Sequence, residues 1–335
     1  MLDDKVVLIT GGTGSFGQKF TEIVLKRYKP KKLIIFSRDE LKQFGMRQRY
    51  PEEQYDCLRF FIGDVRDRER LYRAFDGVDI VVHAAALKQV PACEYNPLEA
   101  VRTNVLGATN VVDAAIDRNV QKVITLSTDK ATSPINLYGA TKLCADKLFT
   151  AANNYSGVHG TRFAVVRYGN LMGSRGSVVP LFLKMRETGV LSITDPRMTR
   201  FWITLQQGVD FVWKSLERMR GGEIFVPKIP SMKILDLARA IAPECRTQVI
   251  GIRPGEKLHE VLVTEDDSRH TLEFDDHFAI LASAFPEWST QHSSQENGGR
   301  SLPDRFRYSS DTNTNWLSVD QLRMMLASRQ MHPID

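Results

Sequence analysis

The sequence lacks the features that mark secreted, membrane-spanning and zinc-binding proteins. Its 335 residues include four cysteines, at positions 57, 93, 144 and 245, and none forms a Cys-x-x-Cys pair. This spacing argues against a disulfide framework or a zinc site. No apolar run approaches the roughly 20 residues that a membrane-spanning helix needs, and residues 1–10 enter a strand without the pattern of a signal peptide. We expect a cytoplasmic protein in a reducing compartment, with no membrane partner.

A block of like charge is also missing. The 45 Lys and Arg residues are interspersed with 40 Asp and Glu residues, which leaves a formal net charge of +5. We therefore expect no nucleic-acid partner, and scattered basic residues suit a phosphorylated small molecule better. With 42% hydrophobic residues, the chain can form a large core and a second, smaller lobe.

Short apolar runs alternate with helical patterns along the first half of the chain. This alternation predicts a doubly wound parallel α/β sheet of the Rossmann type, which binds ligands at the carboxyl ends of its strands. The expected strands are 5–10, 33–36, 58–62, 79–82, 123–126 and 163–168. The expected domains are a Rossmann domain at 1–168 with a return segment near 200–226, a substrate lobe at 169–199 and 227–290, and a flexible segment with a C-terminal helix at 291–335.

The first strand leads into a glycine-rich turn and then a helix to about residue 27. Gly11, Gly14 and Gly17 have the Gly-x-x-Gly-x-x-Gly spacing, which allows a tight turn and close approach of a pyrophosphate to a helix N-terminus. The strand before and the helix after supply the context that the motif requires. We predict a dinucleotide site that also includes Thr13, Ser15 and Phe16.

Residues after the second strand bear on the choice between NAD and NADP. Ser37, Arg38 and Lys42 offer charge and hydrogen-bond donors to a 2′-phosphate. Asp39 and Glu40 are contrary signs, because an acid here favours NAD, but both can instead stabilise the first turn of the next helix. We predict NADP.

The third and fourth strands end in residues that suit the same cofactor. Asp64 is placed to meet an adenine amino group beside Val65, and the small residues at 84–86 let a cofactor lie against the backbone. We interpret His83 as a packed strand-end histidine rather than a catalytic one. The small residues are Ala84, Ala85 and Ala86.

A helix is predicted to follow, to about residue 118. Asn96 would be its N-cap, with Pro97 at the first helical position and Glu99 completing a capping box. Asn104 lies on this helix. A mid-helix Asn usually faces solvent, but one that faces the strand ends would fix the active-site turn, and we include Asn104 in the cofactor site.

The fifth strand ends at residues 127–130, and Tyr138 and Lys142 follow on the next helix. Four residues apart, they share one face and lean back toward the strand end. A phenol has a pKa of about 10, and a neighbouring ammonium lowers it, so the pair suits proton removal from an alcohol. An ordinary amphipathic helix has the same spacing, but the glycine motif favours catalysis.

The second half of the chain is less regular. Arg200 and Arg253 are either diphosphate ligands, since guanidinium bonds such groups in bidentate fashion, or surface arginines, and the sequence leaves both open. Ser318 with Gln321 predicts the capped start of a final short helix.

Together these motifs resemble a known family. The run from Thr10 to Gly17 with Tyr138-x-x-x-Lys142 resembles extended short-chain dehydrogenase/reductases. The stretches at 37–42, 127–131, 134–142, 173–180 and 251–259 resemble, more narrowly, the inverting UDP-N-acetylglucosamine 4,6-dehydratases, which open the route to pseudaminic acid, a sugar of bacterial flagellin. The resemblance covers residues 2–265, with a weaker echo at 308–317, and 266–306 departs from it.

The resemblance implies oxidation at C4 by NADP+, loss of water across C5 and C6, and return of hydride to C6. Tyr138 would take the C4 hydroxyl proton, with Lys142 holding the ribose and lowering the pKa of Tyr138, and with Thr128 orienting the hydroxyl. Lys130 would remove the C5 proton, which requires burial and nearby charge to lower its pKa, and Asp129 would assist loss of the C6 hydroxyl.

Retaining relatives carry Asp-Glu where this chain has Asp129-Lys130, so the resemblance favours inversion at C5. It also implies a homo-oligomer, with UDP-N-acetylglucosamine as substrate. Substrate contacts carried over are Lys88, Asn170, Val178, Arg253 and Glu256, to which we add Arg200.

Three alternatives stay open. A retaining dehydratase would release the other C5 stereoisomer. A 4-epimerase shares the glycine turn and the Tyr138/Lys142 pair but does not need Asp129 and Lys130. An NADP-sensing binding protein generally lacks the Tyr/Lys pair.

Overall fold

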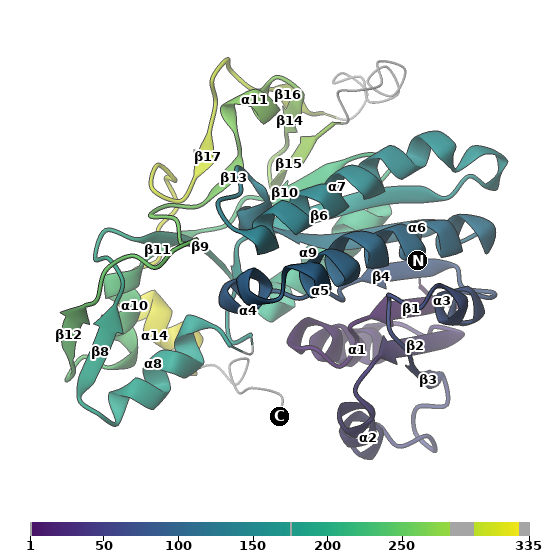
Figure 1. The fold of residues 1–335 in the computed structure, drawn as a ribbon, viewed down its shortest axis with the longest axis horizontal. Coiled ribbons are helices and arrows are strands. Elements are labelled where there is room, and N and C mark those ends of the chain that lie inside the picture. Colours follow the sequence, from purple (N-terminus) through teal and green to yellow (C-terminus); the bar gives the residue numbers. More distant parts are fainter. Residues whose placement is uncertain (1, 175, 282–297, 328–335) are drawn as a thin grey trace.

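A ten-stranded sheet forms the centre of the computed structural model, which describes residues 2–174, 176–281 and 298–327 (Figure 1). Its strands are β1 Val6–Thr10, β2 Lys32–Ser37, β3 Leu58–Ile62, β4 Ile80–His83, β5 Lys122–Thr128, β6 Arg162–Tyr168, β10 Ile224–Pro227, β14 Thr271–Glu273, β15 His277–Ile280 and β16 Arg300–Ser301. The spatial order is β16-β14-β15-β10-β6-β5-β4-β1-β2-β3. All pairs from β3 to β10 are parallel, which confirms the predicted doubly wound sheet.

Helices cover both faces of this sheet. They are α1 Ser15–Arg27, α2 Glu40–Arg49, α3 Arg68–Ala74, α4 Val90–Tyr95, α5 Pro97–Val101, the π-helical η1 Arg102–Leu106, α6 Gly107–Asp117, the 3-10 turn η2 Asp129–Ala131, α7 Leu137–Tyr155, the 3-10 turn η3 Gly157–His159 and α9 Leu205–Arg218. Val123 of β5 packs in one layer with α6 and α7, and its neighbour Ile124 packs in the other with α1 and α9. A strand covered on both faces is apolar at every position, which explains the continuous hydrophobic runs in the sequence.

A smaller lobe lies beyond the carboxyl ends of the parallel strands (Figure 1). Its elements are β7 Asn170–Leu171, α8 Val178–Arg186, β8 Val190–Ile193, β9 Thr199–Ile203, β11 Ser231–Lys233, α10 Ile234–Ile241, β12 Arg246–Val249 and α14 Val319–Ala327. Phe182, Leu237 and Leu322 share its core. β13 Val261–Val263 pairs with β17 Tyr308–Ser309, and α11 Glu265–Ser268 follows β13 and lies beside β14 at the edge of the main sheet (Figure 1).

The C-terminal part differs in places from the expected division. β14 and β15 extend the main sheet as antiparallel strands, so they do not belong to the lobe expected over 227–290. Residues 291–297 of the predicted flexible segment lie outside the described residues, whereas β16 pairs with β14. The capped start of the last helix is confirmed, because Gln321 N donates to Ser318 Oγ at 3.2 Å and Ser318 N donates to Gln321 Oε1 at 2.8 Å.

The helix predicted over 96–118 is not continuous. It consists of α5, η1 and α6, and α4 precedes it. Asn96 occupies the predicted N-cap position before Pro97, but its side chain makes no cap bond to α5, because Asn96 Nδ2 donates to Ala92 O of α4 at 3.0 Å. None of the helices in the described ranges combines the length and apolar character of a membrane span.

The turn from β5 into α7 is held by close backbone contact. Thr128 Oγ1 accepts from Lys130 N at 3.3 Å, and Asn136 caps α7 by accepting from Gly139 N at 2.8 Å. A side chain at Gly139 would overlap the carbonyl oxygen of Lys130. Glycine at this position therefore lets the first turn of α7 lie directly against the active-site turn.

We predict that Gly139→Ala lowers the free energy of unfolding by about 1–3 kcal/mol, because overpacking forces backbone to shift. Gly45→Ala is the matched control, since a side chain at Gly45 in α2 would meet nothing within 4 Å. Removing a helical glycine there should stabilise by roughly 0.5–1 kcal/mol. Urea titration measures both variants, and equal effects would contradict the close contact.

Candidate active site

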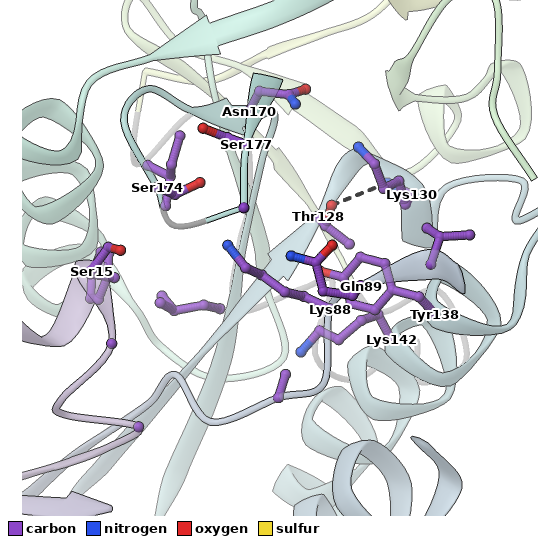
Figure 2. Close-up of a pocket in the computed structure, with 18 of the residues that line it drawn as sticks. Ser15, Lys88, Gln89, Thr128, Lys130, Tyr138, Lys142, Asn170, Ser174 and Ser177 are labelled. Carbon is purple, nitrogen blue, oxygen red and sulfur yellow. Dashed lines mark hydrogen bonds between the residues drawn. The ribbon is translucent and has the colours of Figure 1, made fainter. Parts of the chain in front are cut away.

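A cavity of about 1410 Å3 lies at the carboxyl edge of the parallel strands, between the sheet and the smaller lobe. Of the predicted site residues, all but Asn104 and Asp129 line it. Figure 2 shows Tyr138 and Lys142 near Lys88, with Ser15 on the opposite side of the view. Residues from the ends of the six strands β1 to β6, from α7 and from the lobe thus meet around one space.

The glycine turn forms a cradle that only glycine permits. Gly11 has φ +65°, and a side chain there would lie 2.9 Å from the backbone of Ala85. Gly14 precedes α1 and provides no side-chain cap for its first amides. Backbone amides at the start of a 13-residue helix therefore face the cavity, an arrangement that fits the pyrophosphate of a dinucleotide.

The end of β2 shows what the two acidic residues do. Asp39 Oδ1 accepts from Lys42 N at 3.0 Å as the N-cap of α2, and Glu40 lies in the first turn. The hydrogen bond from the Lys42 ammonium holds the pKa of Asp39 below its usual value. The helix-cap interpretation of these acids is confirmed. Arg38 lines the cavity, half-exposed, 3.5 Å from Asp64.

The Tyr138/Lys142 pair occupies the first turns of α7 and faces the cavity. Burial raises the pKa of Tyr138 to about 12, while the Lys130 charge and a hydrogen bond with Thr128 act in the opposite direction. We expected Lys142 to lower the pKa of Tyr138; in the structure the cation that does so is Lys130. Burial also lowers the pKa of Lys142, against the charge of Asp146.

Lys130 lies between two carboxylates. Its Nζ is 2.9 Å from Asp129 Oδ1 and 3.4 Å from Glu260 Oε1. Burial alone would lower the pKa of Lys130, but the two carboxylates more than offset it and raise this pKa above its usual value. The expectation of a depressed Lys130 pKa is therefore wrong for this state of the protein, because both neighbours stabilise the ammonium.

The sequence analysis missed Glu260. This carboxylate lines the cavity with only 3% of its side chain exposed. Glu260 directly follows the motif at 251–259, and this position next to a charged motif could have indicated a site residue. The sequence does not show that Glu260 lies near Lys130, because 130 positions separate the two residues.

The two lobe arginines have different surroundings. Arg200 donates to the backbone oxygens of Thr199, Leu258 and Lys257 at 2.7–3.0 Å. Its guanidinium therefore holds the lobe together at the cavity wall. Arg253 is half-exposed and 3.9 Å from Glu256, so it has room to meet an anion.

Several buried polar atoms around the cavity have no hydrogen-bond partner within the described ranges. They are Asp129 Oδ2, Asn170 Oδ1, Ser177 Oγ, Glu256 Oε2 and Glu260 Oε2. Unsatisfied buried polar groups are costly and rare in folded proteins. Their concentration around this cavity fits a ligand rich in hydroxyl and amide groups.

Asn104 acts behind the cavity rather than in it. Its Oδ1 accepts from Leu87 N at 2.8 Å, and its Nδ2 donates to Leu87 O at 2.9 Å and to Thr141 Oγ1 at 3.0 Å. Asn104 thus ties the segment after β4 to α7; these bonds do not reach the turn at 128–130, and Asn104 does not line the cavity.

His83 is buried at the end of β4 and hydrogen-bonds Thr10 Oγ1 through Nδ1 at 2.8 Å. It does not line the cavity, which confirms the packed interpretation. Burial lowers the pKa of His83 to about 3, with the Lys142 charge acting in the same direction. The folded protein therefore keeps His83 neutral at neutral pH.

This predicts acid sensitivity. Between about pH 6.5 and 3 the unfolded state binds a proton at His83 that the folded state does not, so His83 makes stability fall with falling pH by up to about 1.4 kcal/mol per pH unit. Urea titrations between pH 6.5 and 4.5 should show a shallower fall for His83→Gln than for the unaltered protein. Identical slopes would refute a neutral buried His83.

Comparisons with known proteins agree with this geometry. The family model described as polysaccharide biosynthesis protein matches residues 7–282. A Campylobacter jejuni protein named UDP-N-acetylglucosamine 4,6-dehydratase (inverting) is 56% identical over 327 residues, 96% of this chain and 97% of the relative. A Rickettsia canadensis protein named UDP-glucose 4-epimerase is 44% identical over 84% of each chain.

A solved structure shows the same fold over the whole chain. Pen from Bacillus thuringiensis superposes with a TM-score of 0.89 at 38% identity, covering 99% of this chain and all of that one. The chain belongs to the polysaccharide biosynthesis protein family, and the predicted resemblance to sugar-nucleotide dehydratases of the extended short-chain dehydrogenase/reductase type is confirmed.

Proposed function

We propose that this protein is an NADP-dependent UDP-N-acetylglucosamine 4,6-dehydratase that inverts C5. The observation that carries the proposal is the Asp129/Lys130 pair beside Tyr138 in a cavity with a dinucleotide cradle. The name of the Campylobacter jejuni relative supports the substrate and the reaction. The product would be a UDP-2-acetamido-2,6-dideoxy-4-keto-L-hexose, which suits pseudaminic acid synthesis for flagellin.

The cofactor half of the cavity supports NADP. Bound there, NADP would supply the hydride acceptor for C4 and the hydride donor for C6. The glycine turn and the α1 amides would hold the pyrophosphate, and Arg38 with Lys42 would meet a 2′-phosphate. Asp39 caps α2 by accepting from Lys42 N, so its presence is weaker evidence for NAD.

The first chemical task of the protein side chains is to take the C4 hydroxyl proton. Tyr138 would do so as a phenolate, with its hydrogen-bond partner Thr128 orienting the hydroxyl. Because burial raises the pKa of Tyr138, nearby positive charge is needed to favour phenolate. Lys130 supplies it in the structure, and Lys142 would hold the ribose.

The second task is elimination. A C4 ketone makes the C5 proton acidic, so oxidation has to come first. Lys130 would then take the C5 proton, and Asp129 would assist departure of the C6 hydroxyl as water. Because the carboxylates around Lys130 favour its ammonium form, it must lose a proton before it can act as a base.

The lobe side of the cavity would bind the sugar nucleotide. Arg253 is the better candidate for the diphosphate, since Arg200 already donates to three backbone oxygens. Asn170 and Glu256 have unpaired buried oxygens that suit sugar hydroxyl and amide groups. Lys88 and Val178 line the same space.

A sugar-nucleotide 4-epimerase is the second candidate, because relatives 44% identical to this chain are named UDP-glucose 4-epimerase. Such an enzyme would use the cradle and Tyr138 but has no task for a charged pair such as Asp129 and Lys130.

The assembly of this chain into a homo-oligomer stays a prediction.

Proton NMR of the product formed from UDP-N-acetylglucosamine tests the proposal. We expect a C6 methyl signal and the couplings of an inverted C5. Recovery of a 4-epimer without a methyl signal would favour the epimerase, and a methyl signal with retained C5 couplings would favour a retaining dehydratase.

Lys130→Ala tests the role of the lysine. It should oxidise C4 more slowly, because Tyr138 remains but loses the positive charge that favours its phenolate, and it should then stall at the 4-keto sugar. Absorbance of the reduced nicotinamide should rise in a single turnover, with no methyl product and no deuterium entering C5 from D2O. Tyr138→Phe is the control that should lose all these signals. Near-normal turnover by Lys130→Ala would show that another residue is the base.

Arg38→Ala tests the cofactor. Loss of a charge-assisted phosphate contact of about 1.5–3 kcal/mol should weaken NADP roughly ten- to a hundredfold and leave NAD nearly unchanged. Arg66→Ala is the matched control, because Arg66 also pairs with Asp64 but does not line the cavity. Isothermal titration gives both constants, and an equal loss for the two cofactors would argue against NADP.

A further inference from the structure

The acid/base site contains a third carboxylate. Glu260 Oε1 lies 3.4 Å from Lys130 Nζ and 3.8 Å from Arg200 Nε. Glu260 Oε2 lies 3.9 Å from Lys257 Nζ and is buried without a hydrogen-bond partner in the described part of the chain. One oxygen thus faces Lys130, and the other is free to take a proton.

The backbone of Glu260 is fixed by a distant segment. Glu260 N donates to Ser310 Oγ at 2.9 Å, and Glu260 O accepts from Ser310 N at 2.8 Å and from Ser309 Oγ at 3.3 Å. These bonds hold the residue just before β13, with its side chain toward η2. The carboxylate is therefore built into the site and does not belong to a mobile surface.

The proposed elimination needs such a group. Lys130 is an ammonium held by two carboxylates, and an ammonium cannot accept the C5 proton. Asp129 Oδ1 already accepts from Thr128 and Lys130 at 2.9 Å each, and Asp129 has its own task at the C6 hydroxyl. Glu260 remains as the acceptor for the surplus proton of Lys130.

The charges around Glu260 support this role. Burial raises the pKa of Glu260, as does the charge of Asp129, while Lys130, Arg200 and Lys257 act in the opposite direction. The net effect is a carboxyl group that binds a proton more readily than an ordinary glutamate does.

We propose that Glu260 accepts one proton from Lys130 so that Lys130 can take the C5 proton, an inference that rests on the proposed dehydratase function. The Nζ–H bond breaks with its electron pair left on nitrogen, and an O–H bond forms on Glu260. The neutral amine then takes the C5 proton and is an ammonium again. Lys130 then donates a proton through Asp129 to the departing C6 hydroxyl, which leaves as water, and it takes back the proton from Glu260, so that the starting ion pair is restored.

Glu260 acts through Lys130 and is a positioning residue in this scheme. Two roles predict opposite results when its charge is removed. If Glu260 only stabilises the ammonium, Glu260→Gln makes Lys130 easier to deprotonate and speeds C5 proton removal. If Glu260 is the proton acceptor, the same change slows that step, because Lys130 must then lose its proton to solvent.

The experiment measures C5 deuterium incorporation from D2O in single turnovers of the NADP-loaded protein with UDP-N-acetylglucosamine between pH 6 and 9. Glu260→Gln should slow incorporation about 100-fold or more at neutral pH, as loss of a general acid–base group does. C4 oxidation, followed by nicotinamide absorbance, should change little. Glu260→Asp should restore part of the rate.

The pH profile separates proton transfer from a structural effect. Incorporation by the unaltered protein should be nearly flat around neutrality, because the proton moves within the Lys130/Glu260 pair. In Glu260→Gln it should rise with pH, about tenfold per unit, as solvent deprotonates Lys130. A rate in Glu260→Gln that is unchanged or faster, or slow but flat with pH, would overturn the inference.

Glu223→Gln is the matched control, since Glu223 is also a buried glutamate but does not line the cavity. It should leave the pH profile as in the unaltered protein, even where thermal stability falls. The experiment distinguishes a wrong function from a wrong role for Glu260. If the proposed function is wrong, the unaltered protein forms no 4-keto-6-deoxy sugar. If the unaltered protein forms this sugar and Glu260→Gln incorporates deuterium at the same rate, only the role of Glu260 is overturned.

Discussion

The site depends on the balance of charge in one small volume. Lys130 lies within 3.4 Å of two carboxylates, and of these Asp129 is fully buried. Buried charges are tolerated only when they are paired and hydrogen-bonded. The turn after β5 and the segment before β13 must therefore meet with little freedom, and this requirement explains why close contacts and backbone bonds surround both.

One of these contacts holds α7 against the turn after β5, and two more join this region to the segment at 255–257. Gly139 brings α7 against the carbonyl of Lys130, Asn136 Nδ2 donates to Gly255 O at 2.8 Å, and Lys257 Nζ donates to Thr132 O at 2.5 Å. The helix that carries Tyr138 is thus bonded to the segment that leads to Glu260. Oxidation and elimination would share one rigid frame, which suits two reactions on adjacent carbons of one sugar.

The features predicted correctly from sequence depend on neighbours along the chain. The glycine turn, the strand and helix alternation and the Tyr138/Lys142 pair each follow from local spacing, and the structure places them at one edge of the sheet. Long-range features were missed. Glu260 reaches Lys130 across 130 positions, and its charge adds to that of the adjacent Asp129 in raising the pKa of Lys130. Asn96 is at the predicted N-cap position but makes no side-chain cap bond, because its side chain bonds to α4, which the sequence pattern did not reveal.

The position of Ser310 late in the sequence affects the order in which the site can fold during translation. The parallel strands β1 to β6 are complete by Tyr168, and domains generally fold from the N-terminus during synthesis. The cofactor cradle can thus form early on the ribosome. The chain reaches Ser309 and Ser310, which fix Glu260, and α14, which closes the lobe core through Leu322, only after these strands. A nascent chain would gain its nucleotide cradle well before its full set of acid/base groups, so the reactive site is assembled only after Ser310 has been translated.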